Sequence, residues 1–320
     1  MRRLLSPALV ALALAGCAAK PPHPESFSFA VTGDAPYNAR EEVAFDAMLA
    51  RIGAQPVAFV LHVGDIKAGG DSPCTDELYA DRRRRLDASR HALVLTPGDN
   101  DWTDCRRESN GKMDPLERLA RMREVFFADG WSLGRARMPL ARQEACAERD
   151  GVVCRCPGLP ENRLWTKNGV ALVTIHVVGS NDNRGFDAAN DAEQHCRAAA
   201  NRAWLENAVR LAESPGIRGL AIVTQANPWE ASRDKVFDGL LAQVAAGARR
   251  IGKPVLFVHG HTHIHRVDRP FRDGHGRAVE NAVRLESFGS PVVGWVRVSV
   301  DPNDAQLFRI EPHAEPASGS

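Results

Sequence analysis

The sequence has almost no net charge, no internal repeat and no low-complexity tract. Its 41 lysine and arginine residues nearly balance its 40 aspartate and glutamate residues, and the formal net charge at pH 7 is +1. Such a balance provides no evidence for a nucleic acid or another polyanion as a specific partner. The one basic run, Arg82 to Arg85, stands in a helical pattern and is interpreted as the solvent-facing side of that helix.

An apolar run of membrane-spanning length is also missing, since a helix that crosses a bilayer needs about 20 residues. A shorter apolar run, Leu4 to Gly16, follows a pair of arginines and ends directly before Cys17. This pattern is typical of a bacterial lipoprotein signal peptide, residues 1–16, with cleavage before Cys17 and lipid on that cysteine. We therefore predict an exported protein, expected at the outer membrane facing the periplasm, that contacts the membrane only through this anchor. Residues 17–26, which are rich in proline, would form a tether.

Beyond Cys17 the sequence contains these further cysteines: Cys74, Cys105, Cys146, Cys154, Cys156 and Cys196. An even number of cysteines in an exported protein favours disulfide bonds. Cys154 and Cys156 are too close in sequence to pair easily with each other, so each is expected to bridge elsewhere. The alternative is a structural zinc ion, with Cys146, Cys154, Cys156 and Cys196 as ligands.

Apolar runs and helical patterns alternate along the rest of the chain. Strands are predicted to end at Asp34, at Asp65 and near Asp99. Helical patterns occupy 40–52, 75–89, 114–129, 188–214 and 235–251, and further strand patterns occupy 170–183, 219–228 and 254–263. This alternation indicates βαβ units around a buried sheet, and therefore an α/β fold.

The same patterns predict the domain organisation. One domain is expected over residues 27–312, because regular patterns continue almost to the end of the chain. Residues from about 131 to 162 have no strong period and contain several cysteines, so they are predicted to form a loop-rich, crosslinked insertion. Residues 313–320 are expected to be a flexible tail.

Acidic residues and histidines stand where the predicted strands end. Three strands run into a glycine followed by Asp34, Asp65 or Asp99, and a fourth runs into the stretch VHGHTHIHR at residues 258–266. Ligands of open α/β sheets gather beyond the carboxyl ends of the strands, and glycine allows the chain to turn there. Carboxylates together with imidazoles suit divalent transition metals. His62, which lies within a predicted strand, is interpreted as a buried histidine and not as a ligand.

The ordered motifs GDAP, VGD, PGDND, TQANP and GHTH, with WLENAV between the third and fourth, resemble those of the calcineurin-like metallophosphoesterase family. The resemblance covers most of the chain after the tether. It implies an αββα sandwich of two mixed β-sheets flanked by helices. It also implies hydrolysis of phosphate mono- or diesters by a metal-activated hydroxide, so that the partner would be a phosphorylated small molecule or a phosphodiester.

The resemblance also implies metal ligands. Asp34 and His263 would bind one ion, and Asp65 would bridge it to a second. The second ion would also be bound by Gln225, His261 and either Asp99 or Asn100. Both assignments stay open, because the third motif can be aligned in two ways that differ by one residue. Two divalent or trivalent ions of Mn, Fe or Zn, or only one ion, would activate water and neutralise phosphate charge.

The sequence departs from the family pattern where that pattern has histidine, at Pro36, Asn100 and Gln225, and Asp99 stands in place of an asparagine. Proline has no ligand atom, asparagine is no acid near neutral pH, and glutamine is a weak neutral ligand. Tyr37, next to Pro36, is a candidate phenolate ligand.

The candidate catalytic residues are therefore Asn100, as the third-motif residue, with His259 or Asp101 as proton donor and His265 as a further donor candidate. Arg106, with Arg107 beside it, is a candidate for binding substrate phosphate through paired hydrogen bonds. A disulfide between Cys74 and Cys105 would stiffen loops beside the site.

Two alternatives to a two-metal enzyme follow from the departures. One is a catalytically idle metal- or phosphate-binding member of the same fold, acting as a binding or scaffold module. The other is a hydrolase with a single metal ion held by Asp65, Asp99, His261 and His263.

Overall fold

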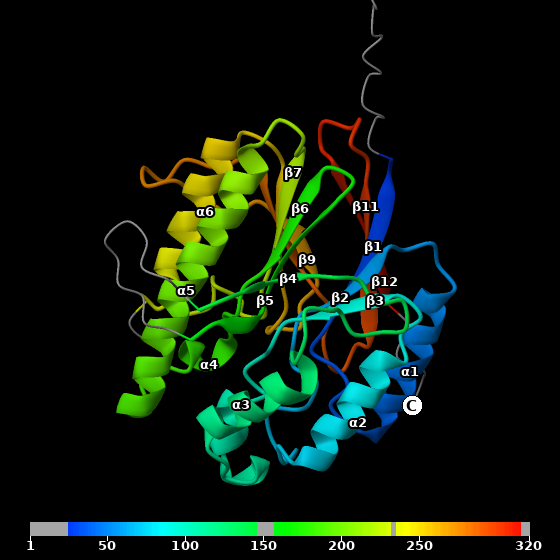
Figure 1. Ribbon diagram of the computed structural model, residues 1–320, viewed down its shortest axis with the longest axis vertical. Helices are drawn as coiled ribbons and strands as arrows, with labels where there is room; N and C mark the ends of the chain where they lie inside the picture. Colours follow the sequence, from blue (N-terminus) through cyan, green and yellow to red (C-terminus); the bar gives the residue numbers. More distant parts are fainter. Residues whose placement is uncertain (1–24, 146–156, 232–234, 315–320) are drawn as a thin grey trace, which may run out of the picture.

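The computed structural model describes residues 25–145, 157–231 and 235–314. In this part of the chain two mixed β-sheets stack face to face, with helices on both outer sides (Figure 1). This is the α/β sandwich expected from the sequence. The predicted signal peptide, Cys17 and most of the tether lie outside the described residues. Three of the four cysteines named as alternative zinc ligands, Cys146, Cys154 and Cys156, also lie outside them.

The first sheet has the strand order β12-β11-β1-β2-β3. Its strands are β1 (Phe27–Thr32), β2 (Phe59–His62), β3 (Ala92–Leu95), β11 (Gly294–Val300) and β12 (Phe308–Ala314). β1, β2 and β3 are parallel, while β11 is antiparallel to β1 and to β12. The parallel strands stop before the glycine-aspartate pairs, so these pairs lie in loops at one edge of the sheet. β12 continues to Ala314, past the domain end expected at residue 312.

The second sheet has the order β4-β5-β6-β7-β8-β10-β9. Its strands are β4 (Ala141–Gln143), β5 (Leu159–Lys167), β6 (Val170–Thr174), β7 (Gly219–Val223), β8 (Val255–His259), β9 (Arg266–Asp268) and β10 (Ala282–Glu286). β6, β7, β8 and β10 are parallel to their neighbours in this group. β4 and the start of β5 belong to the segment predicted as a loop-rich insertion, so part of that segment extends the sheet.

The helices are α1 (Ala39–Gly53), α2 (Asp76–Asp87), α3 (Pro115–Phe126), α4 (Gly179–Asp182), α5 (Ala188–Glu213) and α6 (Asp238–Ile251), with short 3-10 turns η1 (Thr103–Arg106) and η2 (Glu108–Asn110). The helices other than α4 follow the predicted patterns, whereas the segment 170–183, predicted as a strand, is a strand only to Thr174 and contains α4 near its end. Side-chain caps begin four of the long ones: Asn38 accepts from the Glu41 amide, Thr75 from Leu78, Asp114 from Leu116 and Asp187 from Ala189. Caps of this type satisfy amide groups that have no partner inside the helix.

Three apolar clusters hold the layers together. Between the sheets, Phe29 and Leu61 of the first pack with Leu172 and Val258 of the second. The outer faces are covered by α1, α2 and α3 on the first sheet and by α5 and α6 on the second (Figure 1). Each fully buried leucine, valine or phenylalanine side chain stabilises the fold by about 1.5–3 kcal/mol. These clusters therefore stabilise the packing of both sheets against each other and against the helices.

The basic run differs from its sequence interpretation. Arg82 is buried, donates Nε–H to the Ile66 carbonyl and pairs with Glu42 of α1 at 2.8 Å. Arg85 reaches the same glutamate at 2.9 Å and Asp46 at 2.5 Å. The prediction of a solvent-facing side is therefore wrong for Arg82, because acidic residues of α1 lie against this face of α2.

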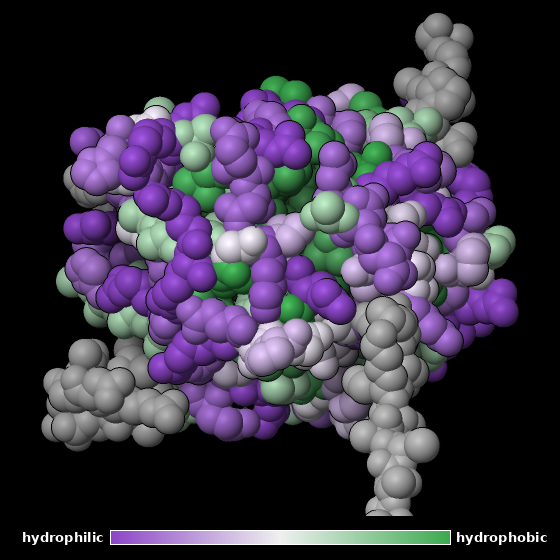
Figure 2. Space-filling model, turned by 90° about the horizontal axis from the view of Figure 1, so that it is seen from above, coloured by the Kyte–Doolittle hydropathy of each residue, from purple (hydrophilic) through white to green (hydrophobic). Residues whose placement is uncertain are grey.

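Figure 2 shows the face of the molecule at the top of Figure 1, where β1 begins. Hydrophilic residues cover most of this face, and hydrophobic residues are visible between them (Figure 2). It is therefore not a continuous apolar surface. Among the described residues, none of the helices combines the length and the apolar character required to cross a membrane.

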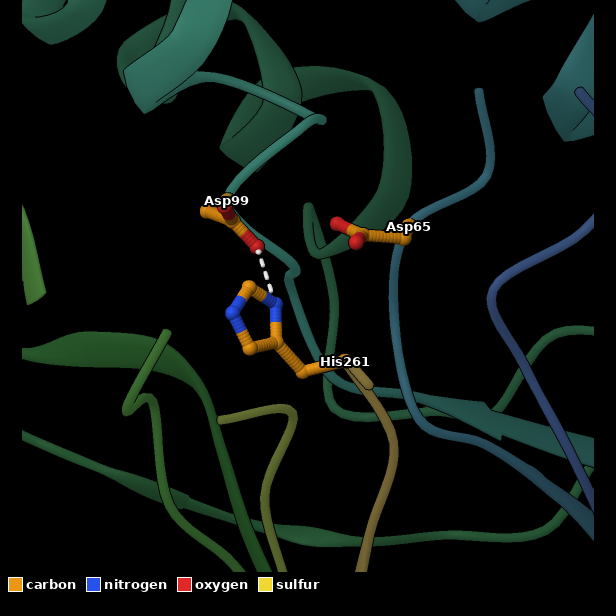
Figure 3. A group of neighbouring side chains, drawn as sticks. All are labelled: Asp65, Asp99 and His261. Carbon is orange, nitrogen blue, oxygen red and sulfur yellow. Dashed lines mark ion pairs between the residues drawn. The ribbon is translucent and has the colours of Figure 1, made fainter. Parts of the chain in front are cut away.

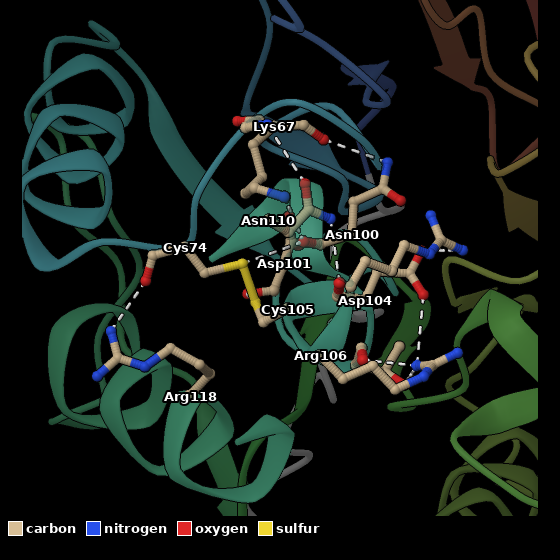
Figure 4. The surroundings of a disulfide bond; sticks show 12 residues. Lys67, Cys74, Asn100, Asp101, Asp104, Cys105, Arg106, Asn110 and Arg118 are labelled. Carbon is tan, nitrogen blue, oxygen red and sulfur yellow. Dashed lines mark hydrogen bonds and ion pairs between the residues drawn. A yellow bond between two sulfur atoms is a disulfide. The ribbon is translucent and has the colours of Figure 1, made fainter. Parts of the chain in front are cut away.

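A disulfide joins Cys74 to Cys105, as Figure 4 shows. The bond links the loop after β2 to η1 after β3, with a sequence separation of 31 residues. Around it, the Arg118 guanidinium donates to the Cys74 carbonyl at 2.9 Å and anchors α3 to the same loop. The crosslink therefore restrains the two loops that carry Asp65 and Asp99.

Replacing both Cys74 and Cys105 by alanine is expected to lower the free energy of unfolding by about 2–4 kcal/mol, because the crosslink no longer restricts the unfolded chain. Urea unfolding followed by circular dichroism measures this change. The single variant Cys105→Ala should lose as much, since one cysteine cannot form the bond. A loss below about 1 kcal/mol in the double variant would show that the bond adds little to stability.

Candidate metal centre

The loops after the parallel strands of both sheets border a cavity of about 510 Å³. Six of the predicted site residues line it: Tyr37, Asp65, Asp99, Asn100, His261 and His263. Sequence reasoning missed several others: Asp104, Ser180, Asn181 and Glu230. The structure thus brings residues more than 200 positions apart to one edge of the sandwich.

Left-handed backbone places the central side chains. Asp34, Asp65, His261 and His263 have φ angles of 49°, 54°, 77° and 60°. Such angles are uncommon outside glycine and cost free energy, so they persist only where the surroundings impose them. Glycine was expected to allow these turns, and Gly64 does have a φ of 93°, but the ligand candidates themselves also adopt the left-handed conformation.

Two glycines allow the loops to approach one another. A Cβ on Gly98 would overlap Oδ1 of Asp65, and a Cβ on Gly260 would overlap Oδ2 of Asp34. The absence of a side chain at these positions is therefore required for the close contact of carboxylate and backbone.

Asp65, Asp99 and His261 form the core of the candidate metal centre (Figure 3). Each offers one potential ligand atom, and these atoms lie within 4.8 Å of one another. Nδ1 of His261 is 3.1 Å from Oδ1 of Asp99, and its Nε2 is 2.9 Å from Oε2 of Glu230. A carboxylate on the far nitrogen of a histidine is the arrangement that orients metal-binding imidazoles in proteins.

The electrostatics of this cluster favour a positive charge. Burial raises the pKa of Asp34 and of Asp65 well above the usual range, and nearby Asp99 raises both further. Burial acts in the same direction on Asp99, but the adjacent His261 lowers the pKa of that carboxyl overall. Burial opposes protonation of His261, yet Asp99 and Glu230 raise its pKa to about 12. These shifts favour the protonated form of the His261 imidazole beside the buried carboxylates.

Tyr37, Asn100 and His263 meet on one side of Asp65. The Tyr37 hydroxyl oxygen lies 3.0 Å from Nδ2 of Asn100, 3.1 Å from Nε2 of His263 and 3.4 Å from Oδ2 of Asp65. Asp34 lies beneath them, accepts the His261 amide at 3.0 Å and is 3.8 Å from Nε2 of His263. Tyr37 therefore lies where the sequence interpretation required a substitute for the missing histidine at position 36.

Gln225 differs from the ligand role expected for it. Its Oε1 accepts the Gly179 amide at 2.8 Å, so the oxygen points away from the cluster. Its Nε2 faces Oδ1 of Asp99 at 2.9 Å, Oδ2 of Asp65 at 3.0 Å and Nδ1 of His261 at 3.1 Å. In this orientation the side chain donates hydrogen bonds to the cluster and offers no ligand oxygen.

The predicted proton donors His259 and Asp101 do not line the cavity. His259 is fully buried beside Trp229 and Phe257, and burial lowers its pKa to about 3. Asp101 is also fully buried, and burial raises its pKa to about 6.

The carboxylate of Asp101 accepts the backbone amides of Asp65, Ile66 and Gly98 at 2.7–3.1 Å. Asp101 therefore ties the loop after β2 to the loop after β3. His265, the other donor candidate, stacks on Phe288 with ring centres 4.5 Å apart and also does not line the cavity.

The predicted phosphate-binding residue, Arg106, does not line the cavity, whereas its neighbour Arg107 does. The Arg106 guanidinium lies 3.3 Å over the Phe186 ring and donates to the Thr103 carbonyl at 2.6 Å. Arg107 instead lines the cavity, with its guanidinium held 2.8 Å from Oδ2 of Asp104 and 2.6 Å from the Gly69 carbonyl. The two arginines are adjacent in sequence, and only the turn η1 determines which one faces the cavity.

A left-handed turn after β6 forms another wall that sequence reasoning missed. Ser180, Asn181, Asp182 and Asn183 have φ angles of 47°, 55°, 52° and 65°. The Ser180 hydroxyl lies 2.9 Å from Oδ2 of Asp99 and 2.8 Å from Oδ1 of Asp104. The sequence SNDN could have predicted this turn, because asparagine and aspartate adopt left-handed backbone more readily than any residue except glycine.

His62 supports the loop below the site and is buried, as predicted from its place in a strand. Its Nδ1 accepts the Gly64 amide at 3.2 Å, and its Nε2 is 3.3 Å from the Ala35 carbonyl, so the neutral ring has partners on both nitrogens. Burial lowers the pKa of His62 to about 4.

We expect stability to fall as the pH drops from about 6.5 toward 4, because the unfolded chain then binds a proton at His62 that the folded chain excludes. The full effect of this one group is about 3 kcal/mol. Urea midpoints measured across this range test it. The variant His62→Gln keeps a donor and an acceptor without titrating, and it should show a weaker pH dependence. Equal slopes for both proteins would contradict the assignment.

No family model and no curated protein matches the sequence. The fold nevertheless defines the class of structure, an α/β sandwich of two mixed sheets flanked by helices. Among solved structures, GAP50, the anchor in the inner membrane complex of Plasmodium, has a TM-score of 0.51 at 10% sequence identity and covers 90% of this chain and 89% of its own. This likeness shows a shared fold.

Two further solved structures have phosphatase or nucleotidase titles. A dimetal phosphatase from Danio rerio has a TM-score of 0.49 at 11% identity, over 90% of this chain and 96% of its own. The 5'-nucleotidase from Candida albicans has a TM-score of 0.48 at 14% identity, over 89% of this chain and 51% of its own, so this chain spans about half its length.

Proposed function

We propose that the protein is a metal-dependent phosphoesterase that hydrolyses phosphate mono- or diesters in the bacterial envelope. The observation that carries this proposal is the convergence of Asp65, Asp99 and His261 on one cavity. The ligand sets expected from the resemblance support the same activity. Residues 27–312, extended by the end of β12, would form the catalytic domain.

The residues around Asp65 suit divalent transition metals, because carboxylate oxygens and imidazole nitrogens are the ligands of Mn, Fe and Zn sites. Asp34 and His263, with Tyr37, would hold an ion on one side of Asp65. Asp99 and His261 lie on the other side, where the resemblance expects a second ion. A bound ion would act as a Lewis acid that activates water and neutralises phosphate charge.

The charge of the cavity wall explains why phosphate binding would need a metal. Asp65, Asp99, Asp104 and Glu230 all line the cavity, and among its described lining residues Arg107 is the one arginine. A phosphate dianion would be repelled by such a wall unless cations were present. Arg107, already fixed by Asp104, is placed to bind a phosphate oxygen that the cations leave exposed.

The envelope location rests on the sequence alone. A signal peptide over residues 1–16 and lipid on Cys17 would attach the protein to the outer membrane through the tether. Labelling with a radioactive fatty acid tests this: the native chain should incorporate label and Cys17→Ala should not. Label in both proteins, or in neither, would argue against lipidation at this residue.

The activity is tested with the purified protein, loaded separately with Mn, Fe or Zn, on a chromogenic phosphate monoester and a chromogenic phosphate diester. Turnover that is absent from the His261→Ala/His263→Ala double variant would support the proposal. No turnover above that variant with any of the metals would refute it. Bound metal without turnover would fit the idle metal-binding module instead.

A further inference from the structure

The two sides of Asp65 carry different chemical groups. Its Oδ2 contacts the Tyr37 hydroxyl at 3.4 Å on one side and Nε2 of Gln225 at 3.0 Å on the other. A phenol oxygen has lone pairs and can bind a cation, whereas an amide NH₂ group only donates. The two candidate ion positions are therefore not equivalent in this chain.

The orientation of Gln225 is determined by its surroundings. The side chain is fully buried, and the Gly179 amide donates to its Oε1. Turning the carboxamide by half a revolution would place NH₂ against that amide and leave a buried donor unpaired, at a cost of about 1–3 kcal/mol. Gly179 also packs closely on the His261 ring, where a Cβ would overlap it.

The Gln225 NH₂ group meets the same three residues that would bind an ion on this side. It lies 2.9–3.1 Å from Asp99, Asp65 and His261, and its hydrogens carry partial positive charge toward both carboxylates. A cation entering this position would have to displace the hydrogen bonds to Asp65 and Asp99 and would be repelled by the NH₂ dipole. Gln225 thus acts as an internal substitute for a cation.

We propose that Gln225 closes the Asp99–His261 side of the centre, so that the protein binds one cation tightly, on the side of Asp34, Tyr37 and His263. This inference rests on the metal dependence in the proposed function but concerns the number of ions and not turnover. Histidine at position 225 would replace the donor with a nitrogen lone pair and open the second position.

The test is the metal content of the full-length protein after loading with Zn²⁺ or Mn²⁺ and removal of free ions, measured by mass spectrometry. Gln225→His should bind about one ion per chain more than the native protein. The control Gln243→His adds an imidazole on α6, where the native glutamine donates to the Arg202 carbonyl, and it should match the native content. A native content of about two ions, or an equal content in Gln225→His and native protein, would overturn the inference.

A second variant covers the case in which Gln225→His folds poorly. Gln225→Glu places another carboxylate beside Asp65 and Asp99, so the metal-free variant should melt at a lower temperature than the native protein. Added Zn²⁺ should raise its melting temperature more than that of the native protein, because the new carboxylate binds the ion. An equal or smaller rise would again overturn the inference. Neither readout depends on hydrolysis, so an inactive protein that passes both tests would reject the proposed function alone.

Discussion

The variant Asp65→Ala is expected to lower kcat/KM for phosphate ester hydrolysis by about a thousandfold, because a metal Lewis acid contributes several kcal/mol and each 1.36 kcal/mol is a factor of ten. Asp65 is the one described carboxylate whose oxygen contacts both Tyr37 and Gln225, so its loss affects both sides of the centre. Steady-state kinetics with the metal that best supports the native activity measure this loss. Metal content should fall in parallel.

The matched control is Asp71→Ala. Asp71 lies in the same loop after β2 and has the same left-handed backbone, with φ of 53° against 54° for Asp65, but it is exposed and does not line the cavity. Its replacement removes an aspartate of the same conformation without touching the centre, and kcat/KM should stay within about twofold of native. Activity of Asp65→Ala within tenfold of that control would contradict a metal-binding role for Asp65.

The variant Arg197→Met is expected to lower the free energy of unfolding by about 3–5 kcal/mol, because it leaves buried carboxylates without their partner. Arg197 of α5 is fully buried and pairs with Asp182 at 2.5 Å and Glu193 at 2.7 Å. It also donates to the His176 and Asp182 carbonyls at 2.9 and 2.8 Å. These bonds hold the left-handed turn that forms the wall of the cavity.

Urea unfolding compares this variant with Arg250→Met. Arg250 of α6 also pairs with two carboxylates, those of Glu206 and Glu213, but its side chain is 45% exposed. An exposed pair contributes only about 0–1 kcal/mol, so the control should lose little. Similar losses for both variants would show that burial of the Arg197 network does not determine its contribution. Activity of Arg197→Met should also fall, since Ser180 in the held turn contacts Asp99.

Much of the architecture follows from local patterns in the sequence. Short apolar runs ending at glycine and aspartate predicted the strands, and the helical patterns between them predicted α1, α2, α3, α5 and α6. Strands that are buried on both faces of a sheet consist of nearly continuous apolar residues, and such runs are recognisable in the sequence without knowledge of tertiary contacts. The segment from 131 to 162 was interpreted less well, because β4 is stabilised by pairing with β5 and β5 by pairing with β6, and neither carries a strong period of its own.

The sequence by itself determined that Asp34, Asp65, Asp99, His261 and His263 follow strands, and parallel strands bring their carboxyl ends to one edge. Only the tertiary structure decided which hydrogen-bond partners surround these side chains and which residues face the cavity. The amide of Gly179, on another loop, turns the nitrogen of Gln225 toward the cluster. Packing buries His259 and Asp101, and the turn η1 directs Arg107 into the cavity in place of Arg106. The physical reason is that the hydrogen-bond partners and the burial of a side chain depend on residues that are distant in sequence. A local sequence pattern contains no information about those residues.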